Sequence, residues 1–517
     1  MLPYLKSASR ISLSCFLFVA MMCHTPAIFA QGYYTTFGQN RVQYHDFEWS
    51  YYEAPNFLAY FYQGGQQLGK FAVMVAESNL EEIEAKLEFK VNRKVEIMVY
   101  HNLSDLKQSN IGQGVQINNT GGVTKIIGNK MFVSFDGDHN RLAEQIKEGI
   151  ARVFLENMIY GGNIQEVLQN AVLLNLPDWF VNGMVSYVGE EWSTEMDARL
   201  REFVEKDKLK NFNKLNAEEA TFAGHALWHY IAQMNGESSI PNLLYLTRIN
   251  RSLESGFLFV LGNTVKNTIA EFNEYYTNLY ASEDSKRIAF DEENQLIRTK
   301  RKVKRRGTLY DEVKVSPNGQ YIAYTTDEKG RHKVYLYDTQ TNTQKVILKN
   351  GFRSFKQPTE TRYPLLAWDK RSQKIAIVYE RRDKVKLVEY SLLEDEITPW
   401  DDMNKFQQVS DIGYMDASDK LILSAVSQQG ESDLYTYFIP NTKTKRLTKD
   451  YHADLEPRFV TINGIRGIVF KSNRYNDTLK VEKLDSIPPT NNYDLFFYDL
   501  AKDKEQVLTR ITNTPIS

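Results

Sequence analysis

The segment that decides the fold opens with Asp138-His139-Asn140-Arg141-Leu142-Ala143-Glu144-Gln145-Ile146-Lys147-Glu148-Gly149-Ile150. From Asp138 to about Met158, apolar residues recur at helical spacing, and Asp138 is a suitable N-cap. A second helix is expected to open at Leu176-Pro177-Asp178-Trp179-Phe180-Val181-Asn182-Gly183-Met184 and to continue to Tyr187. The sequence therefore predicts a pair of helices about which the rest of the chain is organised.

Upstream of this pair, the pattern predicts short strands and one long helix. Strands are expected at Asn56–Tyr62 and Lys94–Tyr100, and a helix at Gln66–Phe89. Val123–Ile127 and Met131–Phe135 are expected to form a hairpin around Gly128-Asn129. The alternation of Lys94–Tyr100 suggests that one face of this strand is solvated. A small mixed sheet ahead of two long helices is an α+β arrangement.

Downstream, Thr194 to Tyr280 is predicted to be helical, with helices at Thr194–Lys208 and Thr221–Met234 and two more after them. Gly236 is placed to end the second helix, and the run Phe257–Gly262 is expected to open the last hinge. The basic run that follows is Arg298-Thr299-Lys300-Arg301-Lys302-Val303-Lys304-Arg305-Arg306. A solvated linker at 286–306 is favoured for it over a docking patch for an acidic partner or anionic lipid.

After Gly307, short strands and turns repeat. If Ile322, Ile375, Ile422 and Ile468 are equivalent, the spacings between them are 53, 47 and 46 residues. Each of these strands is followed by a second, aromatic in three of the four units: Val334–Tyr337, Val385–Val388, Leu434–Tyr437 and Leu495–Tyr498. Multi-stranded repeats of this period are typical of β-propeller blades. At least four blades are expected over 307–517. Because closed rings of this type usually need more, a longer parent chain is favoured over a small ring.

The first thirty residues have the plan of a secretory signal peptide. Lys6 and Arg10 precede an apolar run from Ile11 to Met22, and cleavage is expected after Ala30. Both cysteines, Cys15 and Cys23, lie in this segment, so the exported chain would have no disulfides. Its removal changes the net charge from −2 to −4, which does not suggest a nucleic-acid partner. No transmembrane segment is expected after signal removal, and no phosphate-binding loop or serine nucleophile elbow is present.

Several motifs resemble those of exported Bacteroidota proteins that join a peptidase-MA-like, gluzincin-type domain to a TolB-type β-propeller. They are Phe37–Tyr44, Asp46–Trp49, Gly121–Thr124, Met131–Gly137, Leu176–Met184, Phe259–Gly262 and the strand repeats. The resemblance implies a multidomain chain, with the peptidase-like α+β domain at 31–285 and the propeller at 307–517. It also implies a periplasmic or outer-membrane-associated protein, whose partners are envelope proteins of an outer-membrane assembly or secretion complex.

The same resemblance implies where zinc ligands would lie. The family motif is His-Glu-x-x-His with a Phe two places later; aligning that Phe with Phe154 places Glu148, Gly149 and Arg152 at the His, Glu and His positions. A shift by one residue offers Lys147, Glu148 and Ala151 instead. The third ligand position, on the second helix, is Asn182. Zinc needs three N, S or carboxylate donors, so neither register gives a zinc site, and the domain is interpreted as a pseudopeptidase that needs no cofactor.

One other spacing bears on metal binding. His225 and His229 lie four residues apart and so share a helix face, as zinc ligands do, but Ala226 stands where a general base would follow the first His. A structural role at the edge of the core is favoured over a non-catalytic metal site. Two hypotheses remain: a non-catalytic envelope scaffold, which is preferred, and a zinc-dependent metallopeptidase that uses an unorthodox set such as His225, His229 and a distant carboxylate.

Overall fold

The computed structural model describes residues 43, 46–109, 117–119, 122–161, 174, 176–215, 217–284, 308–353, 360–382, 384–450, 452–474, 493–502 and 504–507. The expected signal peptide, both cysteines, the basic run 298–306 and the end of the chain lie outside these residues. The chain divides into two compact units, Met1–Val42 and Gln43–Ser517, and every described residue belongs to the second. In the described part, no helix combines the length and the apolar character needed to cross a bilayer.

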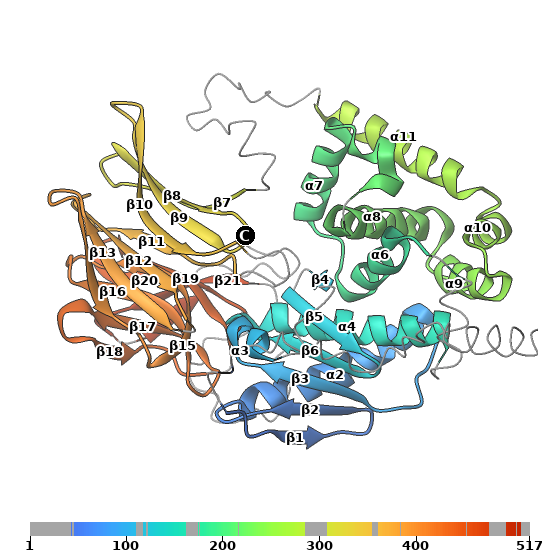
Figure 1. Ribbon diagram of the computed structural model, residues 1–517, viewed down its shortest axis with the longest axis horizontal. Helices are drawn as coiled ribbons and strands as arrows, with labels where there is room; N and C mark the ends of the chain where they lie inside the picture. Colours follow the sequence, from blue (N-terminus) through green and yellow to red (C-terminus); the bar gives the residue numbers. More distant parts are fainter. Residues whose placement is uncertain are drawn as a thin grey trace, which may run out of the picture. The chain divides into compact units, whose positions relative to one another are not determined.

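The N-terminal part of the second unit is a six-stranded mixed sheet in the order β1-β2-β3-β6-β5-β4 (Figure 1). β2–β3 and β3–β6 are parallel pairs, and the other pairs are antiparallel. The expected mixed sheet and the hairpin around Gly128 are confirmed. β1, β4 and the short helix α3 had no clear sequence signal. The elements are β1 (Ser50–Glu53), β2 (Phe57–Phe61), α2 (Gln66–Leu87), β3 (Val95–Tyr100), α3 (Leu103–Gln108), β4 (Ile117–Asn119), β5 (Gly122–Ile127) and β6 (Lys130–Ser134).

The helices follow the sheet, and we call β1 to α11 the helix–sheet region. They are α4 (His139–Tyr160), α6 (Asp178–Gly189), α7 (Thr194–Glu205), the 3-10 helix η2 (Lys208–Lys214), α8 (Ala217–Asn235), α9 (Ser239–Asn250), α10 (Leu253–Leu261) and α11 (Val265–Asp284). The Asp138 carboxylate accepts hydrogen bonds from the backbone N–H groups of Asn140 and Arg141, so the expected N-cap of α4 is confirmed.

Two predictions about the later helices are wrong. Three helices follow α8 rather than two, and the run at 257–261 is not a hinge but the body of α10. The Ser252 hydroxyl caps the start of α10 by accepting from the Ser255 N–H. Gly262 ends the helix in the left-handed conformation, with φ of 68°. The turn therefore lies one position beyond the apolar run, at the glycine itself.

One apolar core joins the sheet to the helices. It contains the buried faces of α2, α4, α6 and α8 and the large rings Trp179, Phe180, Trp228 and Phe257. Val426, from a later strand, belongs to the same core. The face of β3 expected to be solvated is instead half-buried, because β3 lies between β2 and β6 near the centre of the sheet.

Residues from Leu309 onward form four four-stranded antiparallel sheets, which we call the repeat region. The strands proposed from the Ile322, Ile375, Ile422 and Ile468 repeat each pair with the second strand predicted for the same unit, so the four-unit repeat is confirmed. The sheets are β7–β10 (Leu309–Val315, Tyr321–Asp327, Arg331–Asp338, Thr343–Gly351), β11–β14 (Leu365–Trp368, Lys374–Glu380, Val385–Ser391, Glu396–Asp401), β15–β18 (Phe406–Tyr414, Lys420–Ser427, Ser432–Phe438, Lys443–Arg446) and β19–β22 (Asp454–Ile462, Ile465–Ser472, Asp494–Asp499, Lys504–Val507).

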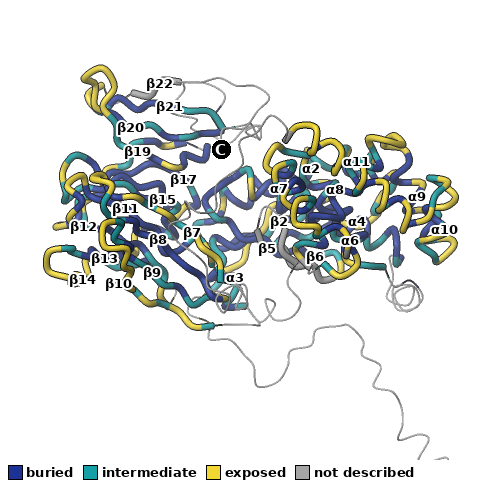
Figure 2. Tube along the Cα trace, turned by 90° about the horizontal axis from the view of Figure 1, so that it is seen from above, coloured by how far each residue is buried: buried dark blue, intermediate teal, exposed yellow. Residues whose placement is uncertain are grey.

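Burial differs across each sheet of the repeat region (Figure 2). The two middle strands are mostly buried, whereas β10, β14 and β18 at one edge are largely exposed. The first strands of successive sheets lie side by side, β7 with β11, β11 with β15, and β15 with β19. The second and third sheets therefore each have a neighbouring sheet on both sides, whereas β7 in the first sheet is largely exposed.

The architecture is therefore mixed α and β, with several sheets, as the sequence indicates. The finer assignments, a zincin-like domain and a TolB-type propeller, stay predictions, and so do the domain limits at 285 and 307.

Candidate functional site

The structure brings together the positions at which the resemblance places zinc ligands. α4 packs against α6, and the Arg152 guanidinium donates from Nη2 to the Asn182 Oδ1 at 2.5 Å. Arg152 is 6% exposed and also lies 3.5 Å from the Glu156 carboxylate. The two helix positions that would share a metal are thus joined directly by a hydrogen bond between a cation and an amide.

Glu148 is buried where α4 meets the C-terminal end of α6. A Cβ atom on Gly189 would lie 2.1 Å from the Glu148 Cγ, so the two helices touch at this point. Gly149, the next position of the family motif, is also buried and presents no side chain. The aliphatic part of the Glu148 side chain is therefore in close contact with the backbone of α6 at Gly189.

α6 and α8 cross at a pair of glycines. A Cβ on Gly224 would lie 1.9 Å from the Trp179 carbonyl oxygen, and one on Gly183 would lie 2.5 Å from the Gly224 backbone. The Trp228 indole donates to the Phe180 carbonyl oxygen at 3.1 Å across the same crossing. The spacing of α4, α6 and α8 is thus fixed by backbone contact and by large buried rings.

His225 and His229 lie on the face of α8 beside this crossing. His225 is 1% exposed, and its Nδ1 is 3.0 Å from the Ser186 hydroxyl. Burial, assisted by the nearby His229, lowers the pKa of His225 to about 3, so the ring is neutral. The His229 ring stacks on Trp192 with centroids 4.7 Å apart. The contacts of both rings are those of side chains packed at the edge of a core.

Glu144 lies one turn before Glu148 on α4, and its pKa is strongly shifted. Burial is the main cause, and the Glu190 carboxylate at the end of α6 adds to it; together they raise the pKa of Glu144 to about 8. The folded protein therefore holds this acid in its neutral form near neutral pH. Nothing in the sequence pattern indicated that Glu144 would be buried or that its pKa would be raised.

Replacing Glu144 with Gln is expected to stabilise the protein at alkaline pH. An acid whose folded pKa lies above its unfolded value of 4.5 reduces stability as pH rises from about 4.5 to about 8. The Gln variant lacks this loss. Its free energy of unfolding should therefore exceed that of the wild type by about 2–4 kcal/mol at pH 9 and equal it at pH 4. Urea unfolding at the two pH values measures this, and equal stability at pH 9 would contradict the shift.

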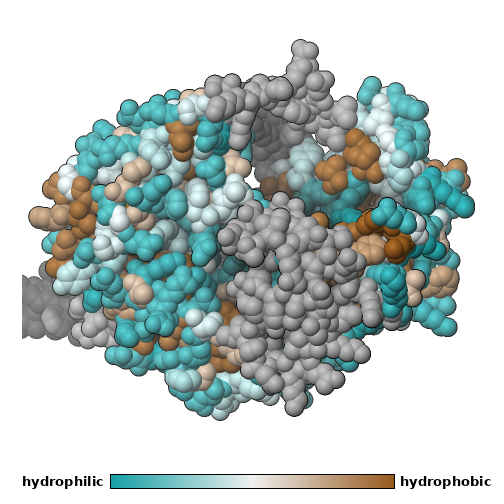
Figure 3. Space-filling view, turned by 180° about the vertical axis from the view of Figure 1, so that it is seen from behind, coloured by the Kyte–Doolittle hydropathy of each residue, from teal (hydrophilic) through white to brown (hydrophobic). Residues whose placement is uncertain are grey.

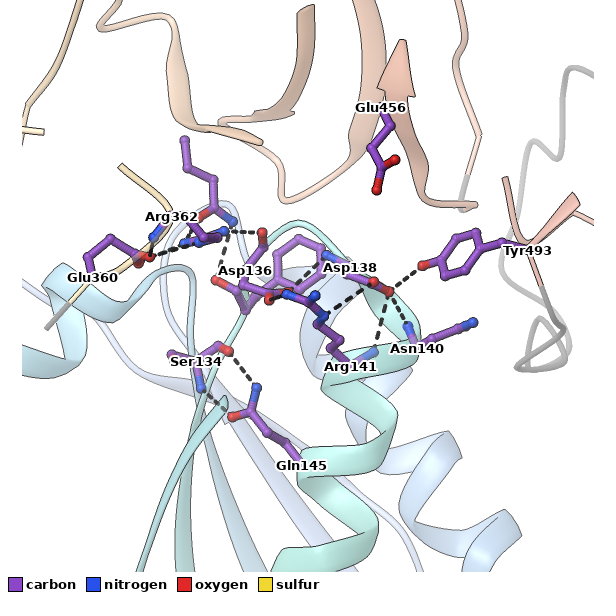
Figure 4. A network of polar contacts seen from close by, with 12 residues as sticks. Ser134, Asp136, Asp138, Asn140, Arg141, Gln145, Glu360, Arg362, Glu456 and Tyr493 are labelled. Carbon is purple, nitrogen blue, oxygen red and sulfur yellow. Dashed lines mark hydrogen bonds and ion pairs between the residues drawn. The ribbon is translucent and has the colours of Figure 1, made fainter. Parts of the chain in front are cut away.

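A second group of polar contacts joins the loop before α4 to the repeat region (Figure 4). The Arg362 guanidinium forms two hydrogen bonds with the Glu360 carboxylate, Nε to Oε1 at 2.9 Å and Nη2 to Oε2 at 2.8 Å. It also donates to the Asp136 carbonyl oxygen and, at 3.0 Å, to the Gln408 side chain. Burial favours the neutral acid, but the charge and hydrogen bonds of Arg362, helped by the charge of Lys107, together outweigh burial and lower the pKa of Glu360 to about 2. We call Asp136, Glu360, Arg362 and Gln408 the junction cluster.

Further contacts reinforce this junction. The Tyr493 hydroxyl donates to the Asp138 carboxylate that caps α4, and Asn473 donates to Asn140 at 2.8 Å. At another point the Gln407 amide nitrogen and the His101 Nδ1 are 2.6 Å apart. The contacts involve the second, third and fourth sheets, so the repeat region holds the N-terminal end of α4 at several points. The sequence offered no signal for them.

In the described residues, no three His, Cys, Asp or Glu side chains are grouped so that they could hold a metal ion. The predicted zinc-motif positions come together but present a cation, an amide, a glycine and one buried carboxylate. The chemistry available at this point is helix-to-helix hydrogen bonding. The one hydroxyl–imidazole contact described beside it, between Ser186 and His225, is buried.

Comparisons with known proteins find structural similarity at low sequence identity. No family model matches the chain, and no curated protein matches it. Among solved structures, similarity extends to TolB from Acinetobacter baumannii, at 17% identity and a TM-score of 0.29 over 40% of this chain and 45% of TolB. The β-propeller domain of the Trilobed protease from Pyrococcus furiosus matches at 10% identity and a TM-score of 0.26, over 39% of this chain and 58% of that one.

A third match is the acylaminoacyl peptidase of Pyrococcus horikoshii, at 8% identity and a TM-score of 0.27 over 39% of this chain. The chain spans less than two thirds of the length of each of these three proteins, only 32% of the peptidase. The structural neighbours are thus TolB-type propeller proteins and the propeller domains of peptidases. At these scores they supply neither an activity nor a partner.

Proposed function

We propose that the chain is a non-catalytic interaction protein of the cell envelope, a pseudopeptidase joined to a propeller. The observation that carries this proposal is the Arg152–Asn182 hydrogen bond. It occupies the two helix positions that would each supply a zinc ligand in a gluzincin-type peptidase. A fold that keeps the helix pair and replaces its donors is suited to binding rather than to hydrolysis.

The residues at these positions do not fit zinc. Zinc in proteins is bound by thiolate, imidazole and carboxylate donors. A guanidinium is a cation with no lone pair to offer a metal, so Arg152 would repel zinc. Gly149 offers no side chain, and the amide of Asn182 already accepts from Arg152. We derive no catalytic step through a metal at this place.

The alternative, a metallopeptidase that uses His225 and His229, has no observation in its favour. The Nδ1 of His225 lies at hydrogen-bond distance from Ser186, and the His229 ring is stacked on Trp192. In the described residues, no third His, Cys, Asp or Glu is grouped with these two rings to complete a zinc site.

The interaction half of the proposal is supported by apolar side chains at the surface. On α9, Tyr245 and Ile249 are 55% and 57% exposed, and on α10 Leu258 and Phe259 are 52% and 70% exposed. Hydrophobic residues gather at the edge of the molecule formed by these helices (Figure 3). Clustered exposed apolar side chains commonly mark a surface that contacts another protein. We assign this surface to an envelope partner.

A photo-crosslinking amino acid at position 259 is expected to capture one discrete envelope protein in intact cells. The matched control is position 393, where Leu393 is 80% exposed in a turn of the second repeat sheet. The proposal predicts a crosslinked product at 259 that is absent at 393. The same products from both positions, or none from position 259, would contradict the interaction role.

A further inference from the structure

A basic hollow lies between the first and second repeat sheets. Its volume is about 460 Å³, and it is lined by Arg331, Lys333, Lys349, Asn350, Gly351 and Arg381. Four of these six residues are cations. A hollow of this size is large enough for a small ligand and too small for a folded partner.

The register of β9 and β10 places the cations on one face. Arg331 and Lys333 alternate along β9 and therefore point the same way. Lys349 on β10 is directly opposite Lys333, and Gly351 is directly opposite Arg331. A Cβ on Gly351 would lie 2.1 Å from the Gly330 carbonyl oxygen, and the φ of 73° also favours glycine, so the backbone approaches closely at this end of the hollow.

The second repeat sheet lines the other side of the hollow. Arg381 follows β12, in the turn before β13, and joins the lining from there. The Asn350 amide donates to the Glu380 carbonyl oxygen at 2.7 Å and so ties the two sheets together next to Arg381. The hollow is therefore built from two sheets that are hydrogen-bonded to each other.

The charges of this hollow are only partly compensated. Arg331 pairs with Glu328, which also pairs with Arg353. Across the described part of the chain, no salt bridge is formed by Lys333, Lys349 or Arg381, although many other surface lysines have one. Two lysines directly opposite each other on neighbouring strands repel, which destabilises the sheet. The arrangement opposes folding and is explained if an anion binds between the cations.

We propose that this hollow binds a phosphate group of a small ligand or of a lipid headgroup. A phosphomonoester carries about −1.5 to −2 charge and three acceptor oxygens, which matches three uncompensated cations better than a single carboxylate does. Arginine and lysine are the usual donors to phosphate oxygens. None of the described residues that line the hollow is aromatic, so they offer no platform for stacking of a nucleic-acid base. This inference is independent of whether the chain is catalytic.

Calorimetric titration of the purified full chain with inorganic pyrophosphate tests the proposal. Binding is expected, and it should weaken as salt increases. The Lys333→Gln/Lys349→Gln variant should bind at least about tenfold more weakly. Its Tm should equal or exceed that of the wild type, because the opposed lysines are gone. The control Lys266→Gln/Lys443→Gln removes the same charge from exposed positions elsewhere and should bind as the wild type does.

Vesicle flotation distinguishes a soluble phosphate ligand from a lipid headgroup. Vesicles that contain phosphatidic acid are compared with vesicles of phosphatidylcholine alone. Pyrophosphate binding that is lost in the double variant supports a soluble phosphate ligand. Variant-sensitive flotation without pyrophosphate binding supports a lipid headgroup. Arg381→Gln lies in an exposed turn and gives a second variant whose folding is not at risk. Binding in neither assay, or binding unchanged by both variants, overturns the proposal.

Discussion

Gly224→Ala is expected to destabilise the protein by about 3 kcal/mol, although alanine is the better helix former. The reason is that the new Cβ would lie 1.9 Å from the Trp179 carbonyl oxygen, which belongs to the backbone of α6 and cannot rotate away. α6 and α8 would have to separate, and their separation would loosen the packing of Trp179, Phe180 and Trp228. Urea unfolding followed by tryptophan fluorescence reports this transition.

Gly236→Asn is the matched control, because it changes a glycine at the end of the same helix. A Cβ at Gly236 meets nothing within 4 Å, and asparagine tolerates the left-handed conformation that its φ of 85° requires. This variant should lose less than about 1 kcal/mol. A Gly224→Ala protein as stable as the wild type would show that the helices do not cross at this distance.

Arg362→Ala is expected to destabilise the protein by about 2–4 kcal/mol. The substitution leaves the Glu360 carboxylate, 12% exposed, without its counter-charge and removes the hydrogen bonds to Asp136 and Gln408. The lower part of this range is favoured, because 21% of the Arg362 side chain is exposed and water screens part of the loss. Thermal unfolding at pH 7 measures the change.

The double variant Glu360→Gln/Arg362→Met serves as the control, since it removes both charges and should recover part of the loss. The pH dependence gives an independent reading. The folded pKa of Glu360, about 2, lies below its unfolded value of 4.5, so the pair contributes stability above about pH 4.5 that is lost as pH falls toward 2. The Arg362→Ala variant should lose less stability than the wild type as pH falls from about 4.5 to about 2. A double variant less stable than Arg362→Ala would contradict the ion-pair account.

Local patterns explain which elements could be predicted from the sequence. The N-cap at Asp138 and the strand repeats depend on residues near one another in the chain, and the structure has them. The run at 257–261 was misread because consecutive apolar residues suit a buried strand or a hinge as well as a helix. The signal that could have placed α10 is Ser252, a good N-cap, followed by Gly262 ten residues later.

The sites depend on distant pairs that local patterns do not encode. The Arg362 contact with Asp136 joins residues 226 positions apart, and the Lys333–Lys349 pair depends on a β9–β10 register that contains a bulge. Only the resemblance to the peptidase family predicted that Arg152 and Asn182 would lie close together, because it indicated where the two helices should meet. Predicting the basic hollow requires the register of β9 with β10 and the position of the neighbouring sheet, and neither can be read from the sequence.

Elemental analysis of the purified protein tests the central claim, that the helix pair is kept without metal chemistry. The wild type and a His225→Ala/His229→Ala variant are measured side by side after dialysis against zinc-containing and then zinc-free buffer. The account predicts far less than one zinc per chain in both proteins. About one zinc per wild-type chain that is lost in the double variant would contradict it and establish a metal site at these histidines.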